Sequence, residues 1–100
     1  MNKNSYLNML GLAHRAQKLS SGEHIVLNDI KNNRAKLILI ANDTGKQTKK
    51  KIIDKCHSAQ VPYKIVDDRE TISHAIGERS RVVLAILDEG FAEKIQSLLL

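Results

Sequence analysis

The chain has 100 residues, of which 42% are hydrophobic and 27% charged, and its formal net charge is +5. These values are typical of one globular domain over residues 1–100 and exclude a disordered chain or a transmembrane protein. No secretory signal is visible in residues 1–8, and the single cysteine, Cys56, excludes an internal disulfide, so we expect a cytoplasmic protein with no membrane partner.

Helices and short strands alternate along the chain. Apolar residues at helical spacing predict the helices, and short apolar or extended runs predict the strands. In chain order we expect a helix at 5–18, a helix at 22–32, a strand at 35–43, a helix at 48–58, a strand at 63–66, a helix at 67–77, a strand at 81–87 and a helix at 88–100. Two strands are continuously apolar and hence covered on both faces. The order predicts an α/β fold: a three-layer α/β/α sandwich around a small, mostly buried mixed sheet.

Positive charge is concentrated in one part of the chain. Between Lys31 and Lys55 there are eight basic residues and two acidic ones, so this window carries +6 and the rest of the chain −1. A basic surplus of this kind in a small domain favours a polyanionic partner such as a nucleic acid, although a solvated basic surface is the alternative.

The chemistry-bearing residues do not form a pattern typical of an enzyme. Cys56 and His57 are sequence neighbours, so they point about 100° apart on a helix, and Cys56 falls on the apolar stripe with Ile52. The four histidines are scattered without metal-ligand spacing, and no glycine-rich nucleotide motif is present. We therefore expect no enzymatic activity, no metal and no cofactor.

Aromatic residues are scarce. Tyr6, Tyr63 and Phe91 are the only three, and Tyr6 and Phe91 lie on apolar stripes expected to be buried. Proteins that bind single-stranded RNA usually stack bases on exposed aromatic side chains. An RNA ligand of this chain is therefore expected to be folded, and to be recognised through its phosphates, sugars and exposed base edges.

The helix that follows Gly22 is the first candidate binding element. Glycine allows close backbone approach, and the first turn of a helix has free N–H groups that can receive a phosphate or carbonyl oxygen. His24, Asn28 and Lys31 follow at a spacing that places them on one face. The alternative is an amphipathic helix whose outer face is simply polar.

Two further segments carry exposed positive charge. The polar loop 77–82 contains Arg79 and Arg81 and precedes a buried strand, and loops held by a rigid sheet often carry binding residues. Lys49–Lys51 opens a helix, where cations oppose the helix dipole, so this run is either a solvated face or a phosphate contact.

Several motifs together resemble the kink-turn-binding family of ribosomal proteins and, more narrowly, its YlxQ-type bacterial members. The similarity covers about residues 6–99. It is carried by the segments SGEHIVLNDIKNNRAKLILIANDTG, VPYKIVDD and ISHAIGERSRVVLAILD. The resemblance implies binding to kink-turns, which are RNA elements with a helix, a bulge and a second helix, sharply bent and containing tandem sheared G·A pairs.

The family motif Gly-x-Asn-Glu-x-x-Lys, which reads the G·A pairs, corresponds to the run that starts at Gly22. The glycine matches, but His24 replaces asparagine, Ile25 replaces glutamate and Asn28 replaces lysine. Ile25 cannot accept a hydrogen bond from guanine, whereas His24 and Asn28 can still bond a base edge. The resemblance places the bulge-contacting loop at Glu78–Arg81, which is more basic here than in the family.

We predict a monomeric, non-enzymatic protein that binds structured RNA, either a kink-turn-like element or ribosomal RNA, in the ribosome or during its assembly. The alternative is a protein-interaction module of the translation machinery, suggested by the acidic run Asp67–Glu70. The predicted RNA-binding residues are Gly22, Glu23, His24, Asn28, Lys31, Arg34, Glu78, Arg79, Ser80 and Arg81.

Overall fold

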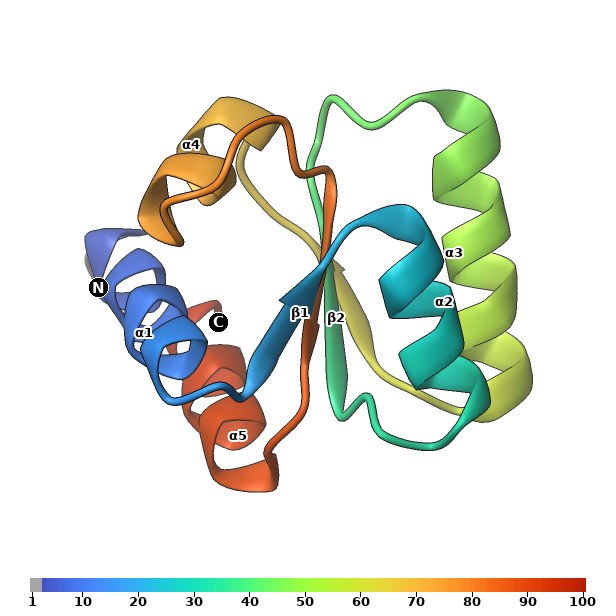
Figure 1. Ribbon diagram of the computed structural model, residues 1–100, viewed down its shortest axis with the longest axis horizontal. Coiled ribbons are helices and arrows are strands. Elements are labelled where there is room, and N and C mark those ends of the chain that lie inside the picture. Colours follow the sequence, from blue (N-terminus) through green and yellow to red (C-terminus); the bar gives the residue numbers. More distant parts are fainter. Residues whose placement is uncertain (1–2) are drawn as a thin grey trace.

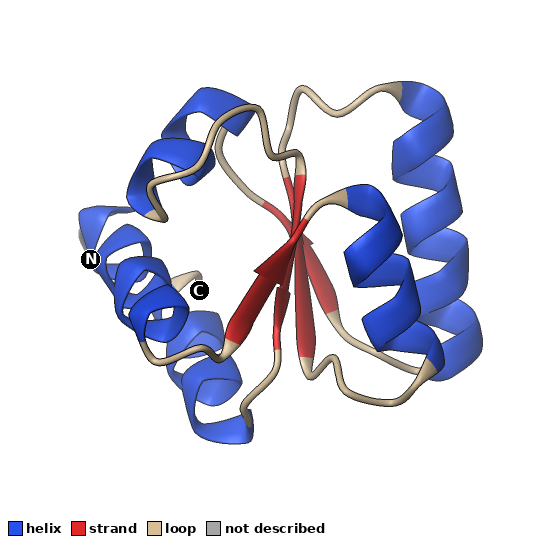
Figure 2. Cartoon of the chain, in the orientation of Figure 1, coloured by secondary structure: helices blue, strands red, loops and turns tan. Residues whose placement is uncertain are grey.

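The computed structural model describes residues 3–100, with side chains described from residue 5 onward. Within residues 3–100, five helices and four strands follow one another (Figures 1 and 2). They are α1 (Lys3–Arg15), β1 (Leu19–Ser21), α2 (Glu23–Lys31), β2 (Leu37–Ile40), α3 (Lys46–Ala59), β3 (Tyr63–Ile65), α4 (Arg69–Ala75), β4 (Val83–Ile86) and α5 (Glu89–Leu98). No helix within residues 3–100 is long and apolar enough to span a bilayer.

The four strands form one mixed sheet in the order β1-β4-β2-β3. Strands β1 and β2 are antiparallel to β4, and β3 is parallel to β2. Because Ser21 pairs with Leu84 and Ile40 with Val83, β1 and β2 both end where β4 begins. Helices α2 and α3 therefore start at the same end of the sheet, the end that the α4–β4 loop also reaches.

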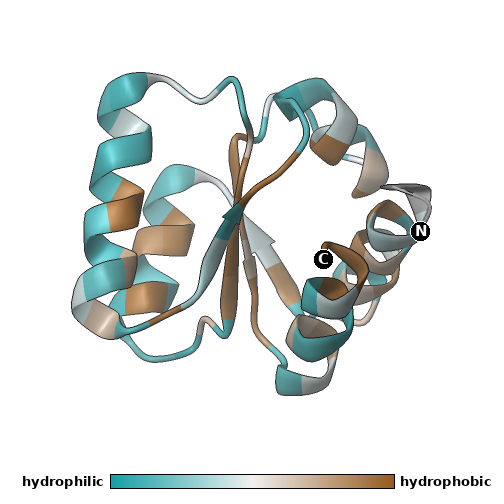
Figure 3. Ribbon diagram, turned by 180° about the vertical axis from the view of Figure 1, so that it is seen from behind, coloured by the Kyte–Doolittle hydropathy of each residue, from teal (hydrophilic) through white to brown (hydrophobic). Residues whose placement is uncertain are grey.

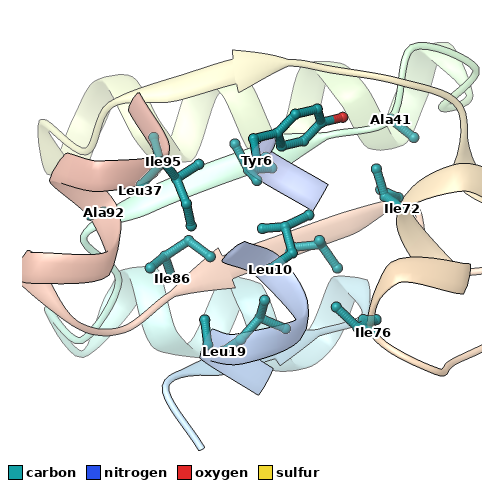
Figure 4. Close-up of a cluster of buried hydrophobic side chains, with 13 residues drawn as sticks. Tyr6, Leu10, Leu19, Leu37, Ala41, Ile72, Ile76, Ile86, Ala92 and Ile95 are labelled. Atoms are coloured by element: carbon teal, nitrogen blue, oxygen red, sulfur yellow. The ribbon is translucent and has the colours of Figure 1, made fainter. Parts of the chain in front are cut away.

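The helices cover both faces of the sheet, so the predicted three-layer sandwich is confirmed. Helices α1, α4 and α5 lie on one face, and α2 and α3 lie on the other (Figure 1). Leu10, Ile72 and Ile95 belong to the core of the first face (Figure 4), and Val26 and Ile52 belong to the core of the second. Strands β2 and β4 are buried at every position, as their continuous apolar sequence predicts.

Strand β1 is absent from the elements predicted from the sequence, where a helix was expected to run to Lys18. Helix α1 instead ends at Arg15, because Gln17 adopts a left-handed φ of 61° and the Lys18 N–H donates to the Ala13 carbonyl at 2.8 Å. The following three residues, including two serines, then pair with β4. So short and polar a segment has no strand pattern of its own, and pairing with β4 determines its conformation.

Other element boundaries shift by a few residues. The third helix begins at Lys46, two residues before the predicted start, and the fourth covers only Arg69–Ala75 of the predicted 67–77. Asp68 is the N-cap of the fourth helix: its carboxylate accepts a hydrogen bond from the Thr71 N–H at 2.8 Å, so Asp67 and Asp68 lie before the helix.

Candidate nucleic-acid interface

Gly22 joins β1 to α2 in a backbone conformation that favours glycine. Its φ is 100° and its ψ is 145°, and its N–H donates to the Val83 carbonyl at 3.1 Å. A Cβ at this position would lie 3.6 Å from Nη1 of Arg81, an ordinary contact, so space is not the constraint. The positive φ gives glycine a structural role at this position, beside the close ligand approach predicted from the sequence.

Helix α2 starts without a side-chain cap, because Gly22 is its N-cap residue. Helix α5, in contrast, has Asp88 at its N-cap, and this carboxylate accepts a hydrogen bond from the Phe91 N–H at 2.9 Å. The N–H groups in the first turn of α2 are therefore available to an oxygen ligand, and the helix dipole favours a negatively charged one.

The α4–β4 loop places a guanidinium beside this helix start. Nη1 of Arg81 is the nearest atom to the Cβ position built at Gly22, and Nη2 donates to Oε1 of Glu78 at 3.2 Å. The Arg81 side chain is 40% exposed, but its Nε is buried and has no hydrogen-bond partner in the described part of the chain. Gly22 with the first turn of α2, and the α4–β4 loop that carries Arg79 and Arg81, thus form one surface. We call it the Gly22–Arg81 cradle.

The loop is held in place by a buried serine of α4. Ser73 is 3% exposed, and its Oγ accepts a hydrogen bond from the Arg81 N–H at 2.8 Å and lies 3.2 Å from the Arg81 carbonyl oxygen, to which it donates. The Ser73 carbonyl also accepts a hydrogen bond from the Glu78 N–H at 2.9 Å. Gly77 and Ser80 both have positive φ, which lets the loop turn tightly and leaves Arg79 and Ser80 exposed.

Glu23, a predicted RNA-binding residue, bonds to the neighbouring helix. Its Oε2 lies 2.7 Å from Nζ of Lys51, and its Oε1 accepts a hydrogen bond from the Thr48 hydroxyl at 3.1 Å. The bonds from Lys51 and Thr48 lower the pKa of the Glu23 carboxyl below its usual value. Glu23 therefore fixes the first turn of α2 to α3, and both carboxylate oxygens are already engaged.

This contact makes the stability contribution of Glu23 dependent on pH. A carboxyl whose pKa is lowered by folding stabilises the folded state above its unfolded pKa, about 4.3 for glutamate, and loses this contribution as the pH falls through the folded value. Glu23→Gln is therefore expected to lower the free energy of unfolding at pH 7, with the difference from wild type shrinking in acid. Urea unfolding between pH 7 and pH 3 measures the difference.

Glu93→Gln is the matched control, because Glu93 is an exposed residue of α5 in the other helical layer. The control should match wild type at every pH. A Glu23→Gln difference that stays constant with pH would show that the charge of this carboxylate is not what stabilises the contact.

The outer face of α2 presents the other predicted contacts. His24, Asn28 and Lys31 are exposed and share one face, as their spacing predicts. The Asn28 side-chain oxygen accepts a hydrogen bond from the Asn32 amide at 3.2 Å. Ile25, which stands where the resembled family has glutamate, is 58% exposed at the same helix start, so an apolar side chain lies beside the polar face.

Arg34 lies apart from the cradle, beyond the other end of α2. Its Nε donates to Oδ1 of Asp29 at 2.9 Å, and Asp29, only 5% exposed, also accepts a hydrogen bond from the Ser20 hydroxyl at 2.6 Å. Helix α2 has nine residues, so Arg34 is separated from Gly22 by roughly 13 Å of helix. Arg34 is 53% exposed, which keeps one side of its guanidinium open to a ligand.

Two residues that fix the position of the site, Ser73 and Lys51, were not predicted from the sequence. Ser73 was expected only as part of a helix, and Lys51 only as part of a lysine run. Neither role has a local signal, because each depends on a residue that is distant in sequence and that the fold brings near. A serine on the buried face of a short helix is the one clue that a backbone partner exists, since buried hydroxyls are almost always hydrogen-bonded.

Two of the three acidic residues in the run that suggested a protein partner, Asp67 and Asp68, have structural roles. Asp68 caps α4, and Asp67 accepts a hydrogen bond from the buried Tyr6 hydroxyl, whose pKa is raised by burial and by this carboxylate. Cys56 is buried in the core beneath α3, and burial raises its pKa to about 11, so the thiol is protonated at neutral pH. Its predicted place on the apolar stripe is confirmed.

Comparison with known proteins connects the chain to a defined group. A family model described as the ribosomal protein L7Ae/L30e/S12e/Gadd45 family matches residues 4–96. The chain is 50% identical over 91 residues to the RNA-binding protein YlxQ of Bacillus subtilis (strain 168), and the match covers 91% of each protein. It is 40% identical over 98 residues to the RNA-binding protein YlxQ of Enterococcus faecium, covering 98% of this chain and 94% of that one.

Solved structures share the fold. A Bacillus halodurans protein of unknown function is 41% identical, with a TM-score of 0.91 over 94% of this chain and 95% of that one. The Giardia lamblia 15.5kD RNA binding protein is 17% identical and shows the same fold with a TM-score of 0.74, over 96% and 89% of the two chains. The chain therefore belongs to the ribosomal protein L7Ae/L30e/S12e/Gadd45 family and is a YlxQ-type member of it.

Proposed function

We propose that this chain is a non-enzymatic RNA-binding protein whose ligand is a bent, structured RNA of the kink-turn type, such as an element of ribosomal RNA. The observation that supports this most directly is the Gly22–Arg81 cradle, in which a helix start without a side-chain cap lies beside Arg81, whose buried Nε has no hydrogen-bond partner among the described residues. The protein acts as a cytoplasmic monomer, in the ribosome or during its assembly.

The cradle suits a phosphate chemically. The N–H groups in the first turn of α2 and the Arg81 guanidinium provide hydrogen-bond donors for anionic oxygens from two sides. Arg79 adds positive charge in the loop beside this point, and Lys31 adds it at the far end of α2, where each contacts a phosphate further along the RNA. These contacts position the RNA without reading its sequence.

Base recognition belongs to the outer face of α2. Asn28 can donate and accept along a base edge, and His24 offers one further donor or acceptor. Glu23 orients this helix through α3 rather than touching the RNA, because Lys51 and Thr48 engage its oxygens. The names of the Bacillus and Enterococcus relatives support an RNA ligand for this chain as well.

The bend of the RNA provides the sharpest test of this function. Binding should be measured for a kink-turn RNA and for the same duplex without its bulge, at several salt concentrations. We expect the kink-turn RNA to bind at least about tenfold more tightly, which is the effect of one good base contact of about 1–3 kcal/mol, and affinity should fall steeply with salt. Equal affinities would contradict selectivity for the bend, and no binding would contradict an RNA ligand.

A charge-matched pair of variants separates the cradle from general electrostatics. Arg79→Gln with Arg81→Gln removes two charges at the cradle, whereas Lys64→Gln with Lys94→Gln removes two charges from exposed positions on β3 and α5. The arginine pair should weaken kink-turn binding much more than the lysine pair. Equal losses would mean that only total charge matters.

A further inference from the structure

Helix α3 carries most of the molecule's excess charge, and the cradle leaves this charge unused. Its 14 residues contain five lysines and a single aspartate, compared with a net charge of +5 for the whole chain. No acidic residue lies in its first turn, so the lysines there oppose the helix dipole. Figure 3, which views the molecule from behind, shows that the outer side of α3 is largely hydrophilic.

Apart from Lys51, the exposed lysines of α3 have few intramolecular contacts. Lys51 is committed to Glu23, and Lys50 forms an exposed ion pair with Asp54 at 2.9 Å on the same helix. An ion pair this exposed to solvent adds little to stability, so another anion can displace it easily. Lys46 and Lys55 are exposed and have no carboxylate partner within residues 3–100.

The position of α3 makes its surface continuous with the cradle. Helices α2 and α3 lie side by side on one face of the sheet and start at the same end of it (Figure 1). The bonds from Lys51 and Thr48 to Glu23 join the two helices within one residue of Gly22. A ligand bound at the start of α2 is therefore close to the start of α3.

We propose that the exposed lysines Lys46, Lys50 and Lys55 form a second RNA contact, which binds the phosphate backbone of a helical arm that leads away from the bend. This inference rests on the proposed function, since it adds a second contact for the same RNA. The three lysines are distributed along roughly 13 Å of helix. Double-stranded DNA carries one phosphate per about 1.7 Å of its axis, both strands counted, and an RNA duplex has a comparable charge density, so several phosphates lie within that distance. Lys46 and Lys55 lie on the two flanks of the exposed side of α3, about 180° apart, with Lys50 between them, so a wide RNA duplex laid across this side can reach all three flexible side chains.

The chemistry of this contact is independent of base sequence. Lysine ammonium groups on flexible stems act as point charges and neutralise phosphates without fixed geometry. The α3 surface therefore contributes affinity that depends on the length of the arm, whereas the cradle contributes recognition of the bend. On this proposal, the lysines of α3 bind phosphates, and the outer face of α2 contacts bases, so the two sets of residues can lie on different helices.

The test uses two RNAs with the same bend, one with a long arm and one with that arm trimmed. The variant Lys46→Gln with Lys50→Gln and Lys55→Gln is compared with Lys18→Gln, Lys64→Gln and Lys94→Gln, which removes the same charge from exposed positions outside α2, α3 and the loop. Lys49 and Lys51 are left unchanged, because Lys49 is half-buried and Lys51 holds Glu23. Circular dichroism and thermal unfolding establish that both variants fold.

We expect the α3 variant to lose at least about tenfold in affinity for the long-armed RNA. It should also lower the slope of log affinity against log salt by about two to three, roughly one unit per lost phosphate contact. Its affinity for the trimmed RNA should match that of the control variant.

Two results would overturn the second contact: equal losses on both RNAs, or losses no larger than those of the control. If wild type binds neither RNA, the proposed function itself fails. If wild type binds the bent RNA more tightly than the duplex without its bulge, while the α3 variant behaves like the control, only the α3 contact fails.

Discussion

Replacing Gly22 by alanine is expected to lower the free energy of unfolding by about 1–3 kcal/mol, because a side chain is strained at a φ of 100° and a ψ of 145°. A change of φ and ψ that relieves this strain shifts the first turn of α2 relative to β4, to which the Gly22 N–H is bonded through the Val83 carbonyl. RNA affinity should therefore fall together with stability. Urea unfolding and RNA titration of the same variant measure the two effects.

Gly45→Ala provides the control, because Gly45 is also the N-cap residue of a helix but has an ordinary φ of −58°. A Cβ at Gly45 would have no described atom within 4 Å beyond its chain neighbours, so alanine fits. The change should alter stability by less than about 1 kcal/mol. If the two glycine variants are equally destabilised, the left-handed backbone at Gly22 is not the cause.

The hydrogen bonds between Ser73 and the Arg81 backbone, which hold the α4–β4 loop, predict a second large effect on stability and RNA binding. Ser73→Ala removes the acceptor of the Arg81 N–H and the donor to the Arg81 carbonyl, and both groups lose a partner that water replaces poorly in a part-buried site. An unsatisfied buried polar group costs about 1–3 kcal/mol, so we expect a loss of stability in that range. The guanidinium beside Gly22 should also become less ordered, which weakens RNA binding beyond what the stability change explains.

Ser97→Ala is the matched control for Ser73→Ala. Ser97 also donates from a helix to a backbone carbonyl, that of Lys94, but it is exposed, so water can replace the bond. Its loss should change stability by less than about 0.5 kcal/mol and leave RNA binding unaltered. An RNA affinity of Ser73→Ala equal to that of wild type would show that the loop keeps its position without the serine.

Much of the fold could be predicted because its strongest signals are local. The apolar runs that become β2 and β4 predict buried strands by themselves, and apolar spacing predicts all five helices. Strand β1 could not be predicted, because its three residues LSS are determined by pairing with β4 rather than by their own pattern. The early end of α1 has the same origin, since the left-handed turn at Gln17 is what directs the chain into that strand.

In the candidate site, too, features with a local sequence pattern could be predicted, and features that depend on distant residues could not. Gly22, the outer face of α2 and the arginine loop could be named from the sequence, because glycine, helical spacing and charge are visible in it. The attachment of Glu23 to α3 could not, because Lys51 lies 28 residues away in sequence. From the sequence, a glutamate at the start of a helix can equally well interact with the helix dipole or contact a ligand. Only the fold shows that Glu23 instead bonds to another helix.

The hydrogen bonds that fix both sides of the cradle to the sheet and to α4 have a consequence for the RNA. Gly22 is bonded to β4, and Arg81 is bonded to Ser73, before any ligand arrives. Because the protein surface already has its binding shape, any rearrangement on binding takes place in the RNA. The apparent affinity is then proportional to the fraction of RNA molecules that already have the matching conformation. For the bent RNA proposed above as the ligand, ions or neighbouring proteins that favour the bent form are then expected to strengthen the complex without touching this chain.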